Sequence, residues 1–84
     1  MRVRLYTKPG CSLCDELKAD LQALQSEIGF VVEECNIEAN QADFARFRYL
    51  IPVLDIEGGP LLHPPHDFVT LRHALLAAGR QVDA

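Results

Sequence analysis

The chain has 84 residues, of which 49% are hydrophobic and 24% are charged, and its formal net charge is −4. This size predicts one domain over residues 1–84, because hydrophobic cores begin to suffice without cross-links at roughly 70 to 80 residues. The net negative charge and the lack of a cluster of basic residues in the sequence argue against nucleic acid as a partner. No apolar run approaches the ~20 residues that cross a bilayer, so we expect no membrane partner and a cytoplasmic location.

The first half of the chain alternates between strand and helix patterns. Apolar and polar residues alternate over Arg2–Thr7, which predicts a strand. From Ser12, apolar residues recur at three- and four-residue steps, which predicts a helix that Gly29 ends. Residues 30–37 have the length and β-branched content of a second strand, and the Glu33-Glu34 pair indicates an edge strand or a solvated face.

A short second helix follows. Asn40 and Asp43 resemble a capping pair, and Phe44 and Phe47 give this helix one apolar stripe that we expect in the core. Pro52 stops it.

The remaining residues predict a hairpin and a final helix. Residues 52–56 and 60–63 are short apolar runs separated by a turn that contains Gly58 and Gly59. The last helix is predicted over residues 67–78, with Asp67 as its cap and Gly79 as its end. Its predicted core residues are Phe68, Leu71 and Leu75. A right-handed βαβ unit followed by this hairpin predicts an α/β fold with one mixed sheet and helices on both faces.

Cys11 and Cys14 lie at the predicted junction of the first strand and the first helix. Two thiols at this spacing can close a small disulfide and reopen it. The unpaired N–H groups and the positive dipole end of a helix favour the thiolate over the thiol. Cys11 is therefore expected to be the nucleophile, because it lies at the cap, whereas Cys14 lies one turn inside.

Other interpretations of the cysteines stay open. The pair could bind zinc or an iron-sulfur centre, although zinc requires four ligands and the nearest candidate pair, His63 and His66, is far along the chain. The thiols could also be idle in an interaction module. Cys35, in the second strand, is expected to be a small buried hydrophobe rather than a third redox thiol.

The run from Leu5 to Cys14, the segment Ile51-Pro52-Val53-Leu54 and the order of elements resemble the small glutaredoxin-like proteins of the thioredoxin-fold superfamily, over nearly the whole chain. This resemblance implies the order β-α-β-α-β-β-α, with a four-stranded sheet in the order 2-1-3-4. It implies that the first and third helices cover one face of the sheet and the second helix the other. It also implies a cis peptide bond at Pro52, facing the thiols, which leaves the backbone of Ile51 free to pair with an extended substrate.

The activity implied by the resemblance is thiol-disulfide oxidoreduction, in which Cys11 attacks a disulfide and Cys14 resolves the mixed disulfide. The implied partners are a protein or small-molecule disulfide and a thiol reductant for recycling. We expect no cofactor, no metal and a monomer. The residues expected to contact the substrate are Lys8, Ser12, Leu13, Ile51 and Pro52.

Two features differ from glutaredoxins. Ser12 and Leu13 stand where glutaredoxins usually carry Pro-Tyr. Gly58-Gly59 lies in the hairpin turn, before the fourth strand, whereas glutaredoxins hold the glutathione carboxylate on a Gly-Gly loop after that strand. Residues 63–67 occupy the place of that loop, so glutathione binding is left open. Because the fourth strand must return toward the thiols, residues 63–67 are expected at the active-site end, where His63 or His66 could favour the thiolate.

Overall fold

The computed structural model describes the backbone of residues 1–82 and the side chains up to residue 80. The strands are β1 (Arg2–Thr7), β2 (Val31–Asn36), β3 (Val53–Ile56) and β4 (Leu61–Leu62). The helices are α1 (Ser12–Ile28), α2 (Gln41–Phe47) and α3 (Phe68–Val82), and a short 3-10 turn, η1 (Ile37–Ala39), precedes α2.

The four strands form one sheet in the order β2-β1-β3-β4. β1 runs parallel to β2, with Thr7 opposite Asn36, while β3 is antiparallel to both β1 and β4. This order confirms the prediction from the resemblance, and it places β2 at an edge. Because β1 is an inner strand, its carboxyl end delivers the cysteine loop to the middle of one end of the sheet.

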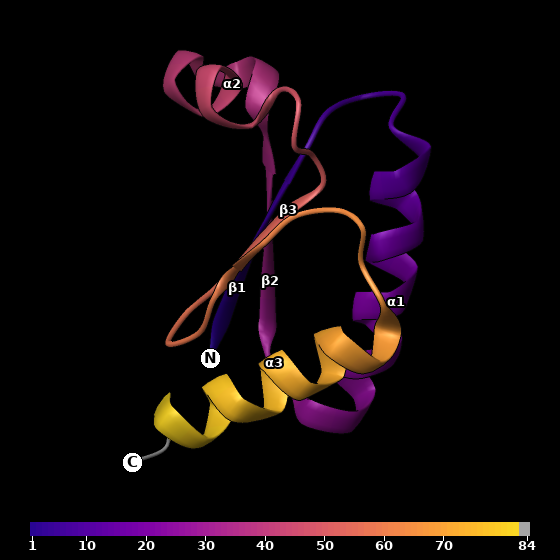
Figure 1. Cartoon of the computed structure of the whole chain (residues 1–84), viewed down its shortest axis with the longest axis vertical. Coiled ribbons are helices and arrows are strands. Elements are labelled where there is room, and N and C mark those ends of the chain that lie inside the picture. The colour runs from indigo at the N-terminus through magenta and orange to yellow at the C-terminus, as the bar shows by residue number, and fades with distance from the viewer. Residues whose placement is uncertain (83–84) are drawn as a thin grey trace.

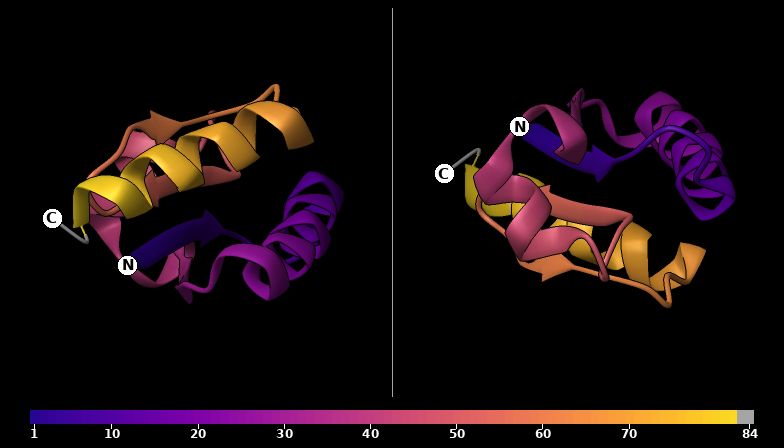
Figure 2. Two further views of the ribbon diagram at one scale, coloured as in Figure 1. Left: turned by 90° about the horizontal axis from the view of Figure 1, so that it is seen from below. Right: turned by 90° about the horizontal axis from the view of Figure 1, so that it is seen from above.

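Helices α1 and α3 pack against one face of the sheet and contact each other (Figures 1 and 2). Leu5 and Leu54 point into this layer, which α1 and α3 fill with leucines. Tyr6, the next residue of β1, points to the opposite face, as the two-residue period of a strand requires. There its ring meets that of Phe47 from α2 at a centroid distance of 4.6 Å. The helices therefore cover the two faces as predicted.

The two ends of the sheet differ in what they carry. The loop from β1 into α1 lies with α2 at the top of Figure 1, whereas the β3–β4 turn lies at the lower end, near the N-terminus. Two contacts fix the lower end: the N–H of Glu57 donates to the carbonyl of Arg2 at 3.0 Å, and the Glu57 side chain accepts from the N–H of Arg2 at 3.2 Å. Gly58 and Gly59 are therefore at the end away from the cysteines.

Gly29 and Gly79 were both predicted to end a helix, and only Gly29 does so. Gly29 ends α1 with φ of 77°, and its N–H donates to the carbonyl of Gln25. Gly79 does not end α3, which continues to Val82, so that prediction is wrong. A glycine stops a helix when it turns left-handed; Gly79 does not adopt the positive φ that Gly29 has, and Ala78 extends the buried stripe through this turn.

Two aromatic residues predicted to lie in the core are exposed instead. Phe44 is 37% exposed, because Phe47 occupies the single face that the two-turn helix α2 turns toward the sheet. Phe68 is 40% exposed, because the buried stripe of α3 begins one turn later, at Leu71. The predicted strands are also longer than β2, β3 and β4 as observed.

Candidate redox site

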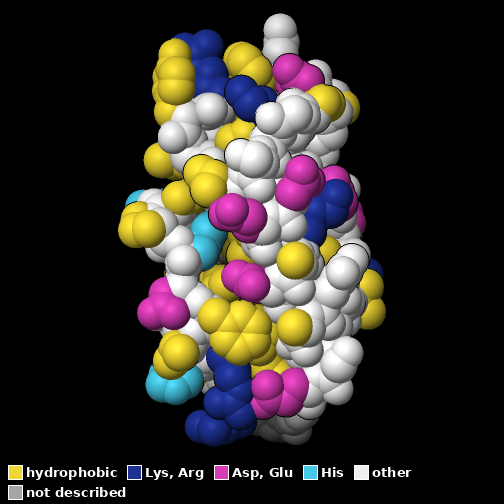
Figure 3. Space-filling model, turned by 90° about the vertical axis from the view of Figure 1, so that its right-hand side faces the viewer, with side chains coloured by type: hydrophobic (Ala, Val, Ile, Leu, Met, Phe, Trp, Pro, Cys, Tyr) yellow, Lys and Arg dark blue, Asp and Glu magenta, His cyan; other side chains and the backbone are white. Residues whose placement is uncertain are grey.

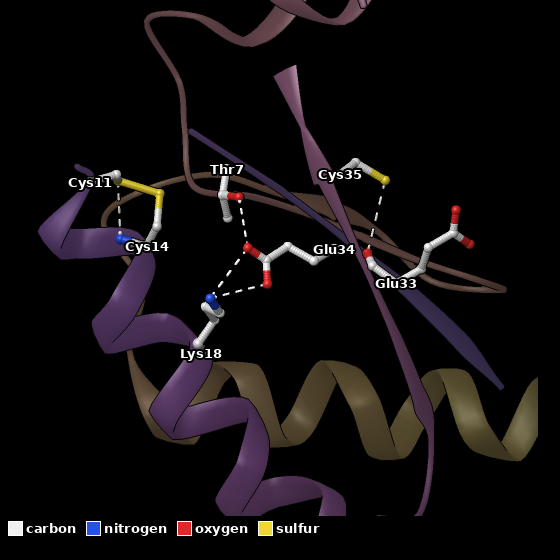
Figure 4. Close-up of polar contacts among 7 residues, drawn as sticks. All are labelled: Thr7, Cys11, Cys14, Lys18, Glu33, Glu34 and Cys35. Carbon is white, nitrogen blue, oxygen red and sulfur yellow. Dashed lines mark hydrogen bonds and ion pairs between the residues drawn. A yellow bond between two sulfur atoms is a disulfide. The ribbon is translucent and has the colours of Figure 1, made fainter. Parts of the chain in front are cut away.

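Cys11 and Cys14 are joined by a disulfide bond, with their Cα atoms 5.2 Å apart. Cys11 is the N-cap of α1, and its Sγ accepts a hydrogen bond from the backbone N–H of Cys14 at 3.1 Å (Figure 4). The predicted location at a strand-to-helix junction is confirmed. A negative charge on this sulfur would face the unpaired N–H groups of the first turn and the positive end of the helix dipole.

The two cysteines of the disulfide differ in their exposure to solvent. Cys14 is 2% exposed, whereas Cys11 is half-buried. Of the two disulfide sulfurs, the one on Cys11 belongs to the residue with the greater contact with solvent.

The segment before β3 lies next to the disulfide end of the molecule. The Ile51–Pro52 peptide bond is cis, as the resemblance implied, and Pro52 is buried. The Nε2 of His66 donates a hydrogen bond to the carbonyl oxygen of Pro52 at 2.9 Å. This contact brings residues 63–67 to the thiol end of the sheet, which confirms their predicted position. A second cis bond joins Pro64 and Pro65.

A groove of about 420 Å³ separates the start of α1 from the 63–67 loop. Its lining is mostly apolar, with two carboxylates at the side of α1. On the face of the molecule that Figure 3 shows, hydrophobic side chains lie next to several Asp or Glu side chains. The lining residues are Leu13, Glu16, Leu17, Asp20, Pro52, Pro64, Pro65 and His66.

The opposite side of α1 borders a polar hollow of about 190 Å³, which Cys14 also lines. There the Oγ1 of Thr7 donates to Glu34 at 3.3 Å, and the Nζ of Lys18 lies 3.0 Å from the other carboxylate oxygen of Glu34 (Figure 4). Neither Lys18 nor Glu34 is among the site residues predicted from the sequence. The signal for Lys18 was its position one turn after Cys14, but Glu34 reaches the hollow only through the register of β2.

The residues expected to contact substrate are divided between these places. Leu13, which is 55% exposed, and Pro52 share the groove, while Lys8 is exposed beside the polar hollow. Ser12 is exposed at the start of α1. Ile51 is half-buried and packs against the core on the α2 side. The structure therefore brings Leu13 and Pro52 together, with Lys8 on another side of the disulfide.

Cys35 is a free cysteine that is half-buried against the core on the α2 side, rather than fully buried as predicted. Burial raises the pKa of its thiol, and the nearby carboxylate of Glu33 raises that pKa further. Its Sγ donates a long contact of 3.9 Å to the carbonyl of Glu33. At neutral pH this residue is therefore a protonated thiol.

The two histidines of the 63–67 loop have different surroundings. His63 is exposed, and its Nδ1 contacts the carbonyl of Pro64 at 3.1 Å, so it is engaged within its own loop. His66 alone of the two lines the groove. Within the described residues, no three His, Cys, Asp or Glu side chains are grouped to hold a metal ion. In the same part of the chain, no helix has the length and apolarity to span a membrane.

A central β1 that leads into a disulfide at a helix start, beside a cis-proline, defines a thioredoxin-fold protein. The sequence profile described as "Glutaredoxin-like domain (DUF836)" matches residues 2–76. The chain therefore belongs to this glutaredoxin-like family.

Three solved structures are similar to the chain. Structural-genomics target protein XcR50 from X. campestris superposes with a TM-score of 0.73 at 29% identity, over 89% of this chain and 96% of that one. Thioredoxin 1 from the thermophilic eubacterium Thermosipho africanus TCF52B gives 0.77 at 11% identity, over 100% of both chains. A malarial protein gives 0.57 at 17% identity, over 95% of this chain and 93% of that one. The last two likenesses concern the fold alone. No curated protein sequence matches the chain significantly.

Proposed function

We propose that this glutaredoxin-like protein is a thiol-disulfide oxidoreductase that cycles between a dithiol and the Cys11–Cys14 disulfide. The observation that carries the proposal is the pairing of a half-buried, helix-capping Cys11 with a buried Cys14 in one disulfide. A partly accessible attacking sulfur and a shielded resolving sulfur are what a two-step exchange needs.

In the first step, the Cys11 thiolate attacks one sulfur of a substrate disulfide. A Cys11–substrate disulfide forms, and the other substrate sulfur leaves as a thiolate that takes a proton from water. In the second step, the Cys14 thiol gives its proton to water, and its sulfur attacks the Cys11 sulfur of the mixed disulfide. The Cys11–Cys14 disulfide forms and the second substrate thiolate leaves. Two electrons pass from the protein to the substrate, and an external thiol reductant returns two electrons in the next cycle.

The first turn of α1 supports this order of attack. The backbone N–H of Cys14 points at the Cys11 sulfur, so the thiolate of Cys11 gains a hydrogen bond and the helix dipole. The N–H groups and the positive dipole end at the start of a helix stabilise a thiolate more than a thiol. Cys14 has no such cap of its own and is shielded from solvent.

The test is the reduction of insulin and of a small mixed disulfide by the reduced protein. Wild type should reduce at least one of them, Cys11→Ser should be inactive, and Cys14→Ser should accumulate a mixed disulfide with the substrate. Cys35→Ser is the matched control and should keep the activity. A wild-type protein that reduces neither disulfide, with its thiols shown to be free, would leave an interaction module as the better description.

A further inference from the structure

The groove between α1 and the 63–67 loop begins at the redox site. Leu13 lies in the sequence between the two cysteines, and its largely exposed side chain lines the groove together with Pro52. Leu17, Pro64 and Pro65 continue the apolar lining. With a volume of about 420 Å³, the groove is within the size range of ligand-binding clefts and can receive a large apolar side chain.

The α1 side of this groove is acidic. Glu16 and Asp20 lie one helical turn apart and both line it. Among the side chains that the structure describes, neither carboxylate is in an ion pair, whereas Lys18, on the other side of α1, is paired with Glu34. The lining contains no lysine or arginine, so two unneutralised charges of the same sign border an apolar cleft.

The apolar lining and the two carboxylates together favour some disulfide substrates over others. An apolar side chain gains by leaving water for the groove, and a cation beside it gains from the two carboxylates. Glutathione offers little apolar surface, and its two carboxylates outnumber its one ammonium group. Glu16 and Asp20 would therefore repel a glutathionyl group at the place where they attract a basic peptide.

We propose that the groove binds the polypeptide chain of a protein disulfide, with an apolar residue near the reacting cysteine on Leu13 and Pro52, and a lysine or arginine at Glu16 and Asp20. This inference rests on the proposed oxidoreductase function and names its substrate class. The position of Leu13, within two residues of both cysteines, places the bound apolar side chain close to the sulfur that Cys11 attacks.

The experiment measures the second-order rate constant at which reduced protein is oxidised by four symmetric disulfides. Three are dimers of a short peptide with one cysteine, flanked by leucine and lysine, by leucine and glutamate, or by serine and lysine; the fourth is glutathione disulfide. Wild type should react with the leucine-lysine peptide about fivefold or more faster than with the leucine-glutamate peptide. The serine-lysine peptide and glutathione disulfide should also be slower.

The double variant Glu16→Gln/Asp20→Asn should lose the preference for lysine over glutamate and keep the preference for leucine over serine. Glu38→Gln/Asp43→Asn is the control for overall charge, because it also removes two carboxylates, from η1 and α2, and neither residue lines the groove. This control should keep both preferences, and raising the salt concentration should weaken only the charge preference.

The possible results distinguish a failure of the groove proposal from a failure of the proposed oxidoreductase function. Equal rates with all three peptides, or a fastest rate with glutathione disulfide, would overturn the groove proposal and leave the oxidoreductase intact. A charge preference that survives in Glu16→Gln/Asp20→Asn would overturn the role of these carboxylates. Reduced protein that reacts with none of the four disulfides would overturn the proposed function, and the inference with it.

Discussion

His66 is bonded through Nε2 to the carbonyl oxygen of Pro52, 14 residues earlier in the chain, at 2.9 Å. This hydrogen bond joins the loop before α3 to the segment before β3, so it holds two sides of the groove together. His66→Leu should lower the free energy of unfolding by about 1 to 2 kcal/mol, because the carbonyl loses its donor in a part-buried place. Such a change corresponds to a fall of several degrees in Tm, at about 4 to 8 °C per kcal/mol.

Thermal unfolding checks this value, with His63→Leu as the matched control. His63 is exposed and bonds within its own loop, so its replacement should change Tm much less. Equal effects of the two substitutions would mean that the bond to Pro52 contributes nothing specific.

The three cysteines of the reduced protein should react in a fixed order with a limiting alkylating agent near neutral pH. Cys11 should be labelled first, because it combines partial exposure with the helix cap, whereas Cys14 is shielded. Cys35 should be slow because its thiol is protonated. Mass spectrometry after brief labelling reads the order, and equal labelling of Cys11 and Cys14 would remove the distinction between attacking and resolving sulfur.

The reactivity of Cys35 should depend on Glu33. Burial and the Glu33 carboxylate both raise the Cys35 pKa, so the thiolate fraction at pH 8 is smaller than that of a free cysteine. Glu33→Gln removes the repelling charge, lowers this pKa and should speed alkylation by up to about fivefold. The rate is measured in the Cys11→Ser/Cys14→Ser background, where Cys35 alone reacts. An unchanged rate would assign the raised pKa to burial alone.

The contact of Glu27 on α1 with Arg72 on α3 should contribute to stability only where Glu27 is charged. The Arg72 guanidinium, 2.7 Å from one oxygen of Glu27, lowers the pKa of this carboxyl below its ordinary value. The contribution is therefore complete above the unfolded-state pKa of about 4.3 and is lost as the pH falls through the lower folded-state pKa.

Thermal unfolding of Arg72→Gln and wild type across pH tests this sign. The Tm of the variant should be lower at pH 7, and the difference should shrink in acid below about pH 4 and in high salt, because the pair is exposed. A Tm difference that is the same at pH 3 and pH 7 would show that Arg72 acts through packing instead.

The sequence predicted the elements whose signals are local. β1 was predicted with its observed bounds, and α1 begins after Cys11 and ends before Gly29 as expected, because alternation, a cap and a left-handed glycine act within a few residues. Gly79 looked the same as Gly29 in sequence, yet its effect depends on a backbone angle that the packing of Ala78 in the core decides. Phe44 and Phe47 could not be distinguished, since only the contact with Tyr6 selects Phe47.

Some features of the candidate site also have a local sequence signal, whereas others depend on how distant elements pack. The cysteine pair, three residues apart, was readable from the sequence, and so was the return of residues 63–67 to the thiol end. The contact of Lys18 with Glu34 depends on the β1–β2 register, and the joint lining of the groove by Glu16 and His66 depends on how α1 lies against the loop before α3. Side-chain contacts between elements so far apart in the chain have no local signal.

Chemistry and recognition are encoded over different lengths of the chain. Cys11 and Cys14 can meet in an unfolded polypeptide, since three peptide units separate them, whereas the lining of the groove comes from residues 13–20, Pro52 and residues 64–66. A nascent or denatured chain therefore holds the two cysteines close together but has no groove beside them. Only the completed sheet, with β3 and β4 in place, brings Pro52 and residues 64–66 next to residues 13–20, so the selectivity that we propose for the groove requires the native structure.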